Sequence, residues 1–140
     1  MTKRLLVTDD ALIIREMIKD VAREDGWEIV GEAANGQEAI ERYQELRPDA
    51  VTLDLVMPEY DGLHALDGIM AADADARVLV VSALDQTEIL KDALRKGARD
   101  FIVKPFENAR LLSALSKICT GSCTDENSSA ATPLERELTL

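Results

Sequence analysis

The stretch AVTLDLVMP, residues 50–58, decides the fold of this chain. Its first four residues form a run suited to a buried strand, and the fifth, Asp54, is a lone carboxylate. Pro58 can hardly continue a central strand, because it has no N–H to donate to a neighbouring strand. We therefore predict a buried strand that reaches solvent at Asp54.

Three further segments have the same form, in which a short apolar run ends on a polar residue. They are residues 5–8 before Asp9 and Asp10, residues 78–81 before Ser82, and residues 101–103 before Lys104. Because the carboxyl ends of parallel strands line one crevice of an α/β sheet, these four ends should converge. Three carboxylates, one hydroxyl and one ammonium in one crevice make up a magnesium-assisted phosphoryl acceptor.

Segments with helical periodicity separate the predicted strands. Their apolar residues recur every three or four positions, at Ile14, Met17, Ile18, Val21 and Ala22, at Ala39, Ile40, Tyr43 and Leu46, at Leu63, Leu66, Ile69 and Met70, at Ile89, Leu90, Ala93 and Leu94, and at Leu111, Leu112, Leu115 and Ile118. We predict helix ends at Gly26, Arg47-Pro48 and Gly97, and N-caps at Asp61 and Asp85. About five strand–helix alternations predict an α/β protein with a doubly wound, five-stranded parallel sheet covered on both faces.

Length and composition restrict the class of protein. A chain of 140 residues has room for one domain of ordinary size. Charged residues interrupt the apolar ones every few positions, so no segment is long enough to cross a membrane, and the first apolar run is too short for a secretory signal. The net charge of −11 argues against electrostatic binding to nucleic acid. We expect a cytoplasmic protein that is not inserted in a membrane.

The periodicity fades from about Cys119, where a linker-like composition begins. We predict one domain over residues 1–118 and a flexible tail over residues 119–140. Cys119 and Cys123 cannot complete a four-ligand zinc site with the single histidine of the chain, so we interpret them as incidental thiols. That histidine, His64, is interpreted as a solvated side chain rather than a phosphorelay histidine.

Four motifs carry a resemblance to a known family. They are Asp9-Asp10 after residues 7–8, Asp54 within residues 53–58, Ser82-Ala83, and Lys104 followed by Pro105-Phe106. In this order they resemble the receiver domain of two-component response regulators, over roughly residues 3–118. The resemblance implies a flavodoxin-like fold. Within the family, residues 97–106 and the lack of an output domain are most similar to the single-domain chemotaxis regulators.

The resemblance implies a role for each residue of the acidic crevice. Asp54 would accept a phosphoryl group from a sensor histidine kinase or a small phosphodonor. Asp9, Asp10, Asp54 and the backbone carbonyl of Val56 would hold Mg²⁺, with Asp10 binding directly and Asp9 mainly through water. The domain would then catalyse its own phosphorylation and dephosphorylation, but we do not expect an enzyme that acts on an external substrate.

The remaining motif residues would respond to the phosphoryl group. Lys104 would place its charge on the phosphoryl oxygens, after a cis bond to Pro105, and the Ser82 hydroxyl would donate to another oxygen. Phe101 stands at the aromatic switch position and would move inward when Ser82 is drawn to the phosphoryl group. Val56 and Leu84 are apolar where the enteric chemotaxis regulator has polar side chains, which predicts slow dephosphorylation.

The implied output face is basic within an acidic protein. Residues 91–117 hold Lys91, Arg95, Lys96, Arg99, Lys104, Arg110 and Lys117 against only Asp92, Asp100 and Glu107. An ordinary solvated helical face would have the same composition. A basic output face suits an acidic patch on a protein partner, such as a flagellar motor switch protein.

Other interpretations of the same residues stay open. Asp9-Asp10 could cap a helix, Ser82 could bond the backbone at a strand end, and Lys104 could be a surface charge. The chain could be the receiver part of a DNA-binding regulator. It could also be an aspartyl phosphatase-like hydrolase, although this needs a second acid near the nucleophile, where Val56 stands, and a substrate cap.

Overall fold

The computed structural model describes residues 3–57, 61–83 and 85–119. Within them lies one five-stranded parallel sheet with the strand order β2-β1-β3-β4-β5. The strands are β1 (Arg4–Thr8), β2 (Glu28–Ala33), β3 (Ala50–Asp54), β4 (Val78–Ala83) and β5 (Asp100–Lys104). The predicted α/β fold with five parallel strands is confirmed, and the strand that ends on Asp54 lies at the centre of the sheet.

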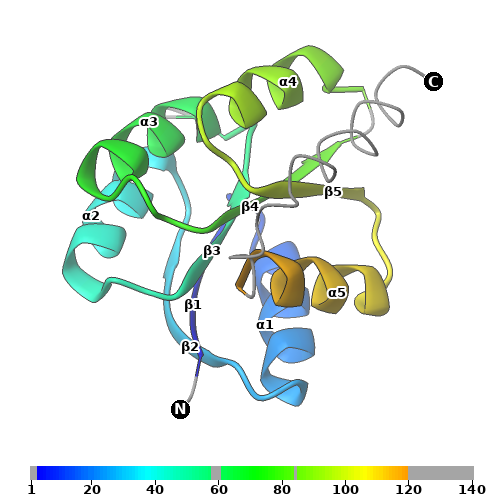
Figure 1. The fold of residues 1–140 in the computed structure, drawn as a ribbon. Coiled ribbons are helices and arrows are strands. Elements are labelled where there is room, and N and C mark those ends of the chain that lie inside the picture. Colours follow the sequence, from blue (N-terminus) through cyan, green and yellow to red (C-terminus); the bar gives the residue numbers. More distant parts are fainter. Residues whose placement is uncertain (1–2, 58–60, 84, 120–140) are drawn as a thin grey trace.

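Five helices cover the two faces of the sheet (Figure 1). They are α1 (Leu12–Glu24), α2 (Gly36–Leu46), α3 (Gly62–Ala72), α4 (Thr87–Arg95) and α5 (Asn108–Cys119). Helices α1 and α5 pack on one face, and α2, α3 and α4 pack on the other (Figure 1). None of the helices in the described part is long and apolar enough to cross a membrane.

Each face of the sheet has its own apolar core, because successive strand residues point to opposite faces. Val51 and Leu53 of β3 join the core under α2, α3 and α4, whereas Ala50 joins the core under α1 and α5. Most of the helix residues in the two cores are the apolar residues that the helical periodicity predicted. Met17 is an exception, since 43% of its surface is exposed on α1.

Most of the predicted helix boundaries are confirmed. Gly26 and Gly97 follow helices with φ values of 94° and 120°, which favour glycine because a Cβ is strained there. Asp61 caps α3 by accepting the N–H of His64 at 3.0 Å. The predicted N-cap at Asp85 is wrong, because α4 begins one residue later and has Gln86 at its N-cap.

The chain order brings the polar strand ends to one edge of the sheet. After β1 the chain crosses to β2 on one side, and after β2 it crosses back to β3 on the other side of β1. This reversal makes the end of β1 and β3 the switch point of the sheet, where doubly wound folds bind ligands. Thr8 is in register with Leu53, so the residues that follow both strands emerge together.

Candidate functional site

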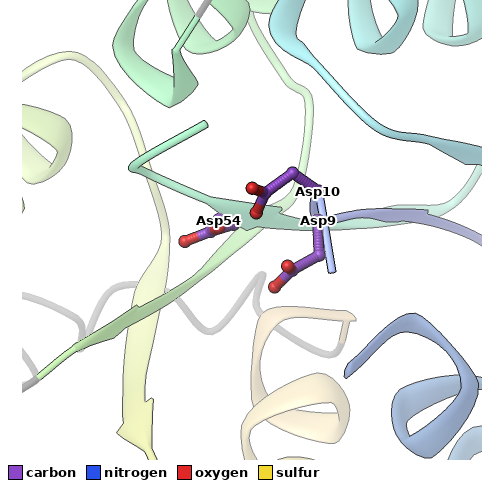
Figure 2. Close-up of side chains that lie close together, drawn as sticks. All are labelled: Asp9, Asp10 and Asp54. Carbon is purple, nitrogen blue, oxygen red and sulfur yellow. The ribbon is translucent and has the colours of Figure 1, made fainter. Parts of the chain in front are cut away.

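Three carboxylates meet at the switch point (Figure 2). Asp9 and Asp10 follow β1, and Asp54 is the last residue of β3. One carboxylate oxygen of each lies within 4.8 Å of the others. The predicted convergence of these strand ends is therefore confirmed, and it joins residues 45 positions apart, from Asp9 to Asp54.

Asp9 is fully buried, and both of its carboxylate oxygens and its backbone N–H make hydrogen bonds. Its Oδ1 accepts the backbone N–H of Ala11 at 2.9 Å, and its Oδ2 accepts the Lys104 ammonium at 2.9 Å. Its own N–H donates to the Ala33 carbonyl of β2 at 3.1 Å. Asp9 is not the N-cap of α1, because that position is Ala11 and makes no side-chain cap bond.

An ion-pair network between α1 and β2 contacts the backbone of Asp9. The Arg15 guanidinium donates from Nη1 to the Asp9 carbonyl at 2.7 Å and from Nε to Glu32 at 2.9 Å. Glu32 also accepts the Lys19 ammonium at 2.7 Å, and this hydrogen bond is the main reason why the pKa of Glu32 lies below its usual range. This network was not predicted from the sequence. A partial signal was available, since Arg15 and Lys19 are four residues apart on one helical face.

Asp54 is a buried carboxylate with 4% of its surface exposed. Burial is the largest cause that raises its pKa to about 6, and the Asp9 charge adds to it, while Lys104 acts in the opposite direction. The Val56 N–H approaches Asp54 Oδ1 at 3.4 Å. The side chain therefore has few protein donors of its own, and its negative charge is left for a cation to offset.

Lys104 reaches the carboxylates from the end of β5, across the end of β4. Its Nζ lies 2.9 Å from Asp9 Oδ2 and 3.5 Å from Asp54 Oδ1. Burial lowers the pKa of Lys104, but the hydrogen bond and charge of Asp9 and Asp54 outweigh it, so the pKa is raised. Lys104 is thus a permanent cation between two buried acids, and the predicted cis bond to Pro105 is confirmed.

Three carboxylates against one ammonium leave the site with an excess of negative charge. Every ligand atom that the three acids offer is oxygen, which suits a hard divalent cation such as Mg²⁺. Asp10 is the exposed member, whereas both oxygens of Asp9 already accept hydrogen bonds. This arrangement fits the expectation that Asp10 binds the cation directly and Asp9 through water.

Ser82 and Phe101 do not take part in these contacts. The buried Ser82 hydroxyl lies 3.1 Å from the Ala83 carbonyl and 3.2 Å from Gln86 Oε1. Phe101 is already packed in the core under α2, α3 and α4, with 3% of its surface exposed. The inward movement that we expect of this ring is therefore complete in this conformation, and the switch role of both residues stays a prediction.

The other residues singled out by the sequence make no side-chain contact with the acidic cluster among the described residues. His64 is exposed on α3, as predicted, and Cys119 is a half-buried free thiol whose pKa is raised mainly by burial. Val56 stands beside Asp54 with 47% of its surface exposed, and its predicted role as a carbonyl ligand stays a prediction. Leu84, Cys123 and the predicted tail from residue 120 onward lie outside the described residues.

The doubly wound sheet and the acidic crevice at its switch point are those expected of a receiver domain, and comparison with known proteins assigns the chain to the same family. The family model of the response regulator receiver domain matches residues 5–116. The chain belongs to this family. It is a receiver domain, a phosphorylation-activated response regulator module, as the motifs predicted.

Within this family, the chain is similar to chemotaxis proteins in particular. The chain is 48% identical over 118 residues to the chemotaxis protein CheY of Thermotoga maritima, which covers 84% of this chain and 98% of that protein. It is 52% identical over 114 residues to CheY of Listeria monocytogenes, covering 81% and 96% of the two chains. A solved CheX–CheY complex with BeF₃ and Mg²⁺ from Borrelia burgdorferi contains a chain of similar fold, with a TM-score of 0.79, 36% identity, and coverage of 83% of this chain and 88% of that one.

Proposed function

We propose that this protein is a chemotaxis response regulator that accepts a phosphoryl group on Asp54 with the help of Mg²⁺. The observation that carries the proposal is the buried Asp54 carboxylate, which lies beside two more acids and within 3.5 Å of the Lys104 ammonium. Relatives of about 50% identity are chemotaxis proteins, matched over nearly their whole length. In this role the protein works in the cytoplasm.

Asp54 is the nucleophile in the proposed reaction. A carboxylate oxygen attacks the phosphorus of a phosphohistidine, the new O–P bond forms, and the P–N bond breaks with its electron pair going to the imidazole. Asp9, Asp10, Asp54 and the Val56 carbonyl would hold Mg²⁺, which supplies positive charge that offsets the like-charge encounter of carboxylate and phosphoryl group. The protein catalyses this transfer, and the later hydrolysis, on itself.

Lys104 stabilises the charge that gathers on the phosphoryl oxygens. It is held beside Asp54 by its 2.9 Å contact with Asp9, so the cation needs little rearrangement before the transfer. Ser82 donates to a phosphoryl oxygen after the transfer. The same change in charge then alters the packing at the end of β4 and the start of α4.

The surface around the crevice suits a protein phosphodonor. Leu12 and Ile13 at the start of α1 are 59% and 67% exposed, and Met17 and Val56 are exposed as well. Exposed apolar side chains close to a polar site are typical of a protein-binding surface. They support a sensor histidine kinase as the partner that brings the phosphohistidine to Asp54.

The output partner is a protein that binds the α4–β5–α5 side, and we propose a flagellar motor switch protein. The positive charge of this side is smaller than the sequence suggests. Arg95 pairs with Asp92 at 3.0 Å, Lys96 with Asp67 at 3.1 Å, and Lys117 approaches Asp100 at 4.0 Å. Ion pairs therefore offset part of the positive charge that this face offers to a partner.

The alternative functions have less support. A receiver part of a DNA-binding regulator is not favoured, because the relatives of about 50% identity are chemotaxis proteins. The hydrolase alternative needs an acid two residues after the nucleophile, and Val56 occupies that position.

The proposal is tested by phosphorylation with radiolabelled acetyl phosphate and Mg²⁺. Wild-type protein should carry one acyl phosphate that alkali and hydroxylamine remove, and excess chelator should prevent labelling. Asp54→Asn should carry none, while keeping its fold because the amide has nearly the same volume. Asp75→Asn is the matched control, since this exposed carboxylate follows α3 at the opposite end of the strands. A label that persists in Asp54→Asn would place the phosphoryl group on another residue.

A further inference from the structure

The side chain of Gln86 turns back from the start of α4 toward the end of β4. Its amide oxygen Oε1 accepts the Ala83 N–H at 2.9 Å and lies 3.2 Å from the Ser82 hydroxyl. Gln86 is the N-cap residue of α4, but its side chain makes no cap bond to the helix. The side chain is thus committed to β4, and two donors converge on one oxygen.

The chemistry of these groups fixes the direction of the bonds. Because a backbone N–H can only donate, the Gln86 atom facing Ala83 must be the amide oxygen and not the amide nitrogen. Ser82 has a single hydroxyl proton, which it can give to Gln86 or to the Ala83 carbonyl at 3.1 Å. While the proton points at either acceptor, it is not available to a third.

We propose that Gln86 is a positioning residue that restrains the Ser82 hydroxyl and opposes its hydrogen bond to the phosphoryl group. The inference rests on the proposed function, in which Ser82 donates to an oxygen of phosphorylated Asp54. Ser82 is the penultimate residue of β4 and Asp54 is the last residue of the adjacent β3, with Asp54 in register with Val81, so a phosphoryl group on Asp54 and the Gln86 oxygen compete for one hydroxyl at the ends of neighbouring strands. Phosphorylation must therefore displace the Gln86 oxygen from Ser82.

The competition sets the cost of switching without preventing it. A charged phosphoryl oxygen forms a hydrogen bond roughly twice as strong as that of a neutral amide, so the phosphoryl group wins once it is present. The Gln86 bond subtracts from that gain. Its loss should therefore strengthen the binding of a phosphoryl mimic by about twofold to tenfold, the range that corresponds to one neutral hydrogen bond.

Displacement of Gln86 also reaches the helix that follows. The Gln86 backbone joins the β4–α4 turn to the helix, because its N–H donates to the Ala83 carbonyl at 3.2 Å and its carbonyl accepts the Leu90 N–H at 3.0 Å. Release of the side chain removes one of the ties between β4 and the first turn of α4. A change in the hydrogen bonds of Ser82 therefore alters how the first turn of α4 is attached to β4.

The test measures the affinity for beryllofluoride in the presence of Mg²⁺, followed by amide NMR shifts. Gln86→Leu keeps the size of the side chain and removes the acceptor, so binding should tighten by about twofold to tenfold. Gln86→Glu keeps an acceptor and should not tighten binding. In a Ser82→Ala background, which has no hydroxyl to release, Gln86→Leu should have a clearly smaller effect. Such a dependence is not expected of a merely structural residue.

Gln37→Leu is the matched control, because the side-chain amide of Gln37 donates to Glu41 on the same helix, α2, at 3.1 Å. Its affinity for beryllofluoride should equal that of the wild type. Equal effects of Gln86→Leu with and without Ser82, or no effect at all, would overturn the restraint while leaving the proposed function intact. If wild-type protein bound no beryllofluoride, the proposed function would fail and the restraint with it.

The wild-type protein provides a second measurement that needs no variant. The Ala83 amide proton is bonded to Gln86 and should shift when beryllofluoride displaces that oxygen, together with the side-chain amide signals of Gln86. Unchanged Gln86 side-chain signals at saturation would show that the bond persists and would contradict the proposal.

Discussion

The crevice contains two sets of residues that are organised differently. In the set supplied by the ends of β1, β3 and β5, Asp9, Asp54 and Lys104 each lie within 3.5 Å of at least one other member. In the set supplied by β4 and the start of α4, Ser82 contacts Ala83 and Gln86 and makes none of its hydrogen bonds to the acids. We call these the acceptor side and the response side. The fold builds the acceptor side in advance, and the response side has bonds that must be exchanged before it can act.

The largest effect should come from removal of the exposed carboxylate on the acceptor side. Asp10→Ala takes away the acid that is least engaged with the protein and should abolish both Mg²⁺ binding and labelling by acetyl phosphate. Isothermal titration with Mg²⁺ measures the first, and the label measures the second. Asp20→Ala, on the exposed surface of α1, is the control. Normal labelling of Asp10→Ala would show that the acidic cluster is not the metal site.

The buried Asp54 should make the metal-free protein less stable as the pH rises. Its pKa is raised from 3.8 to about 6, so the folded state disfavours the ionised form. The stability is unaffected below about pH 3, where Asp54 is protonated in both states, falls as the pH rises from about 4 to about 6, and levels off above that, with a total loss of at most about 3 kcal/mol. Asp54→Asn should therefore be more stable than wild type at pH 7 in chelator.

Urea denaturation at pH 4 and pH 7 checks this expectation. The stability difference between Asp54→Asn and the wild type should be much smaller at pH 4 than at pH 7, and Mg²⁺ should reduce it at pH 7 by binding the folded wild type. A difference that is the same at both pH values would mean that the carboxylate charge is not its cause.

Substitution of Arg15 tests whether its network with Asp9 and Glu32 contributes to Mg²⁺ binding on the acceptor side. Arg15→Gln removes the donor to the Asp9 carbonyl and one partner of Glu32, and should cost about 1 to 2 kcal/mol of stability. Because a residue that orients a ligand often alters metal affinity, Mg²⁺ binding should weaken about tenfold. Arg23→Gln is the control, since Arg23 is exposed and, within the described residues, its side chain pairs with Asp20 alone, at 3.9 Å. Unchanged Mg²⁺ affinity in folded Arg15→Gln would limit this network to stability.

The smallest expected effect concerns the lifetime of the phosphoryl group. Val56 places an exposed apolar side chain beside Asp54, where it cannot orient an attacking water. Val56→Asn should speed the loss of label after the donor is removed by about twofold to tenfold, the range that corresponds to one neutral hydrogen bond. The companion substitution Leu84→Glu should act in the same direction. Decay as fast in the wild type as in Val56→Asn would rule out this explanation of a long lifetime.

The sequence was sufficient for the acceptor side because strand ends reveal it. Apolar runs that stop on Asp9, Asp54 and Lys104 predict both the sheet and the polar edge, since parallel strands end together. The response side depends on side-chain rotamers that periodicity does not encode. Gln86 was therefore missed, and Asp85 was wrongly expected to cap α4. The contact of Arg15 with a backbone carbonyl was missed for the same reason, because it depends on how α1 packs against β1.

The basic segment gives a second example of this limit. The sequence shows that residues 91–117 are rich in Lys and Arg, but it does not show which of them meet acids from other elements. Lys96 pairs with Asp67 from α3, 29 residues away, and Lys104 is used in the crevice. Such pairings arise from the tertiary fold, so a count of charges along the chain overestimates the charge of the surface.

The most direct test of the difference between the two sides is the map of backbone amide shifts on addition of beryllofluoride and Mg²⁺. If the acceptor side is built in advance and the response side exchanges its bonds, shifts beyond the immediate neighbours of Asp54 should concentrate between Ser82 and Arg110. Ala83 and Gln86 should be among the largest. Shifts confined to the neighbours of Asp54 would contradict the account, because the crevice would then bind a phosphoryl mimic without switching anything.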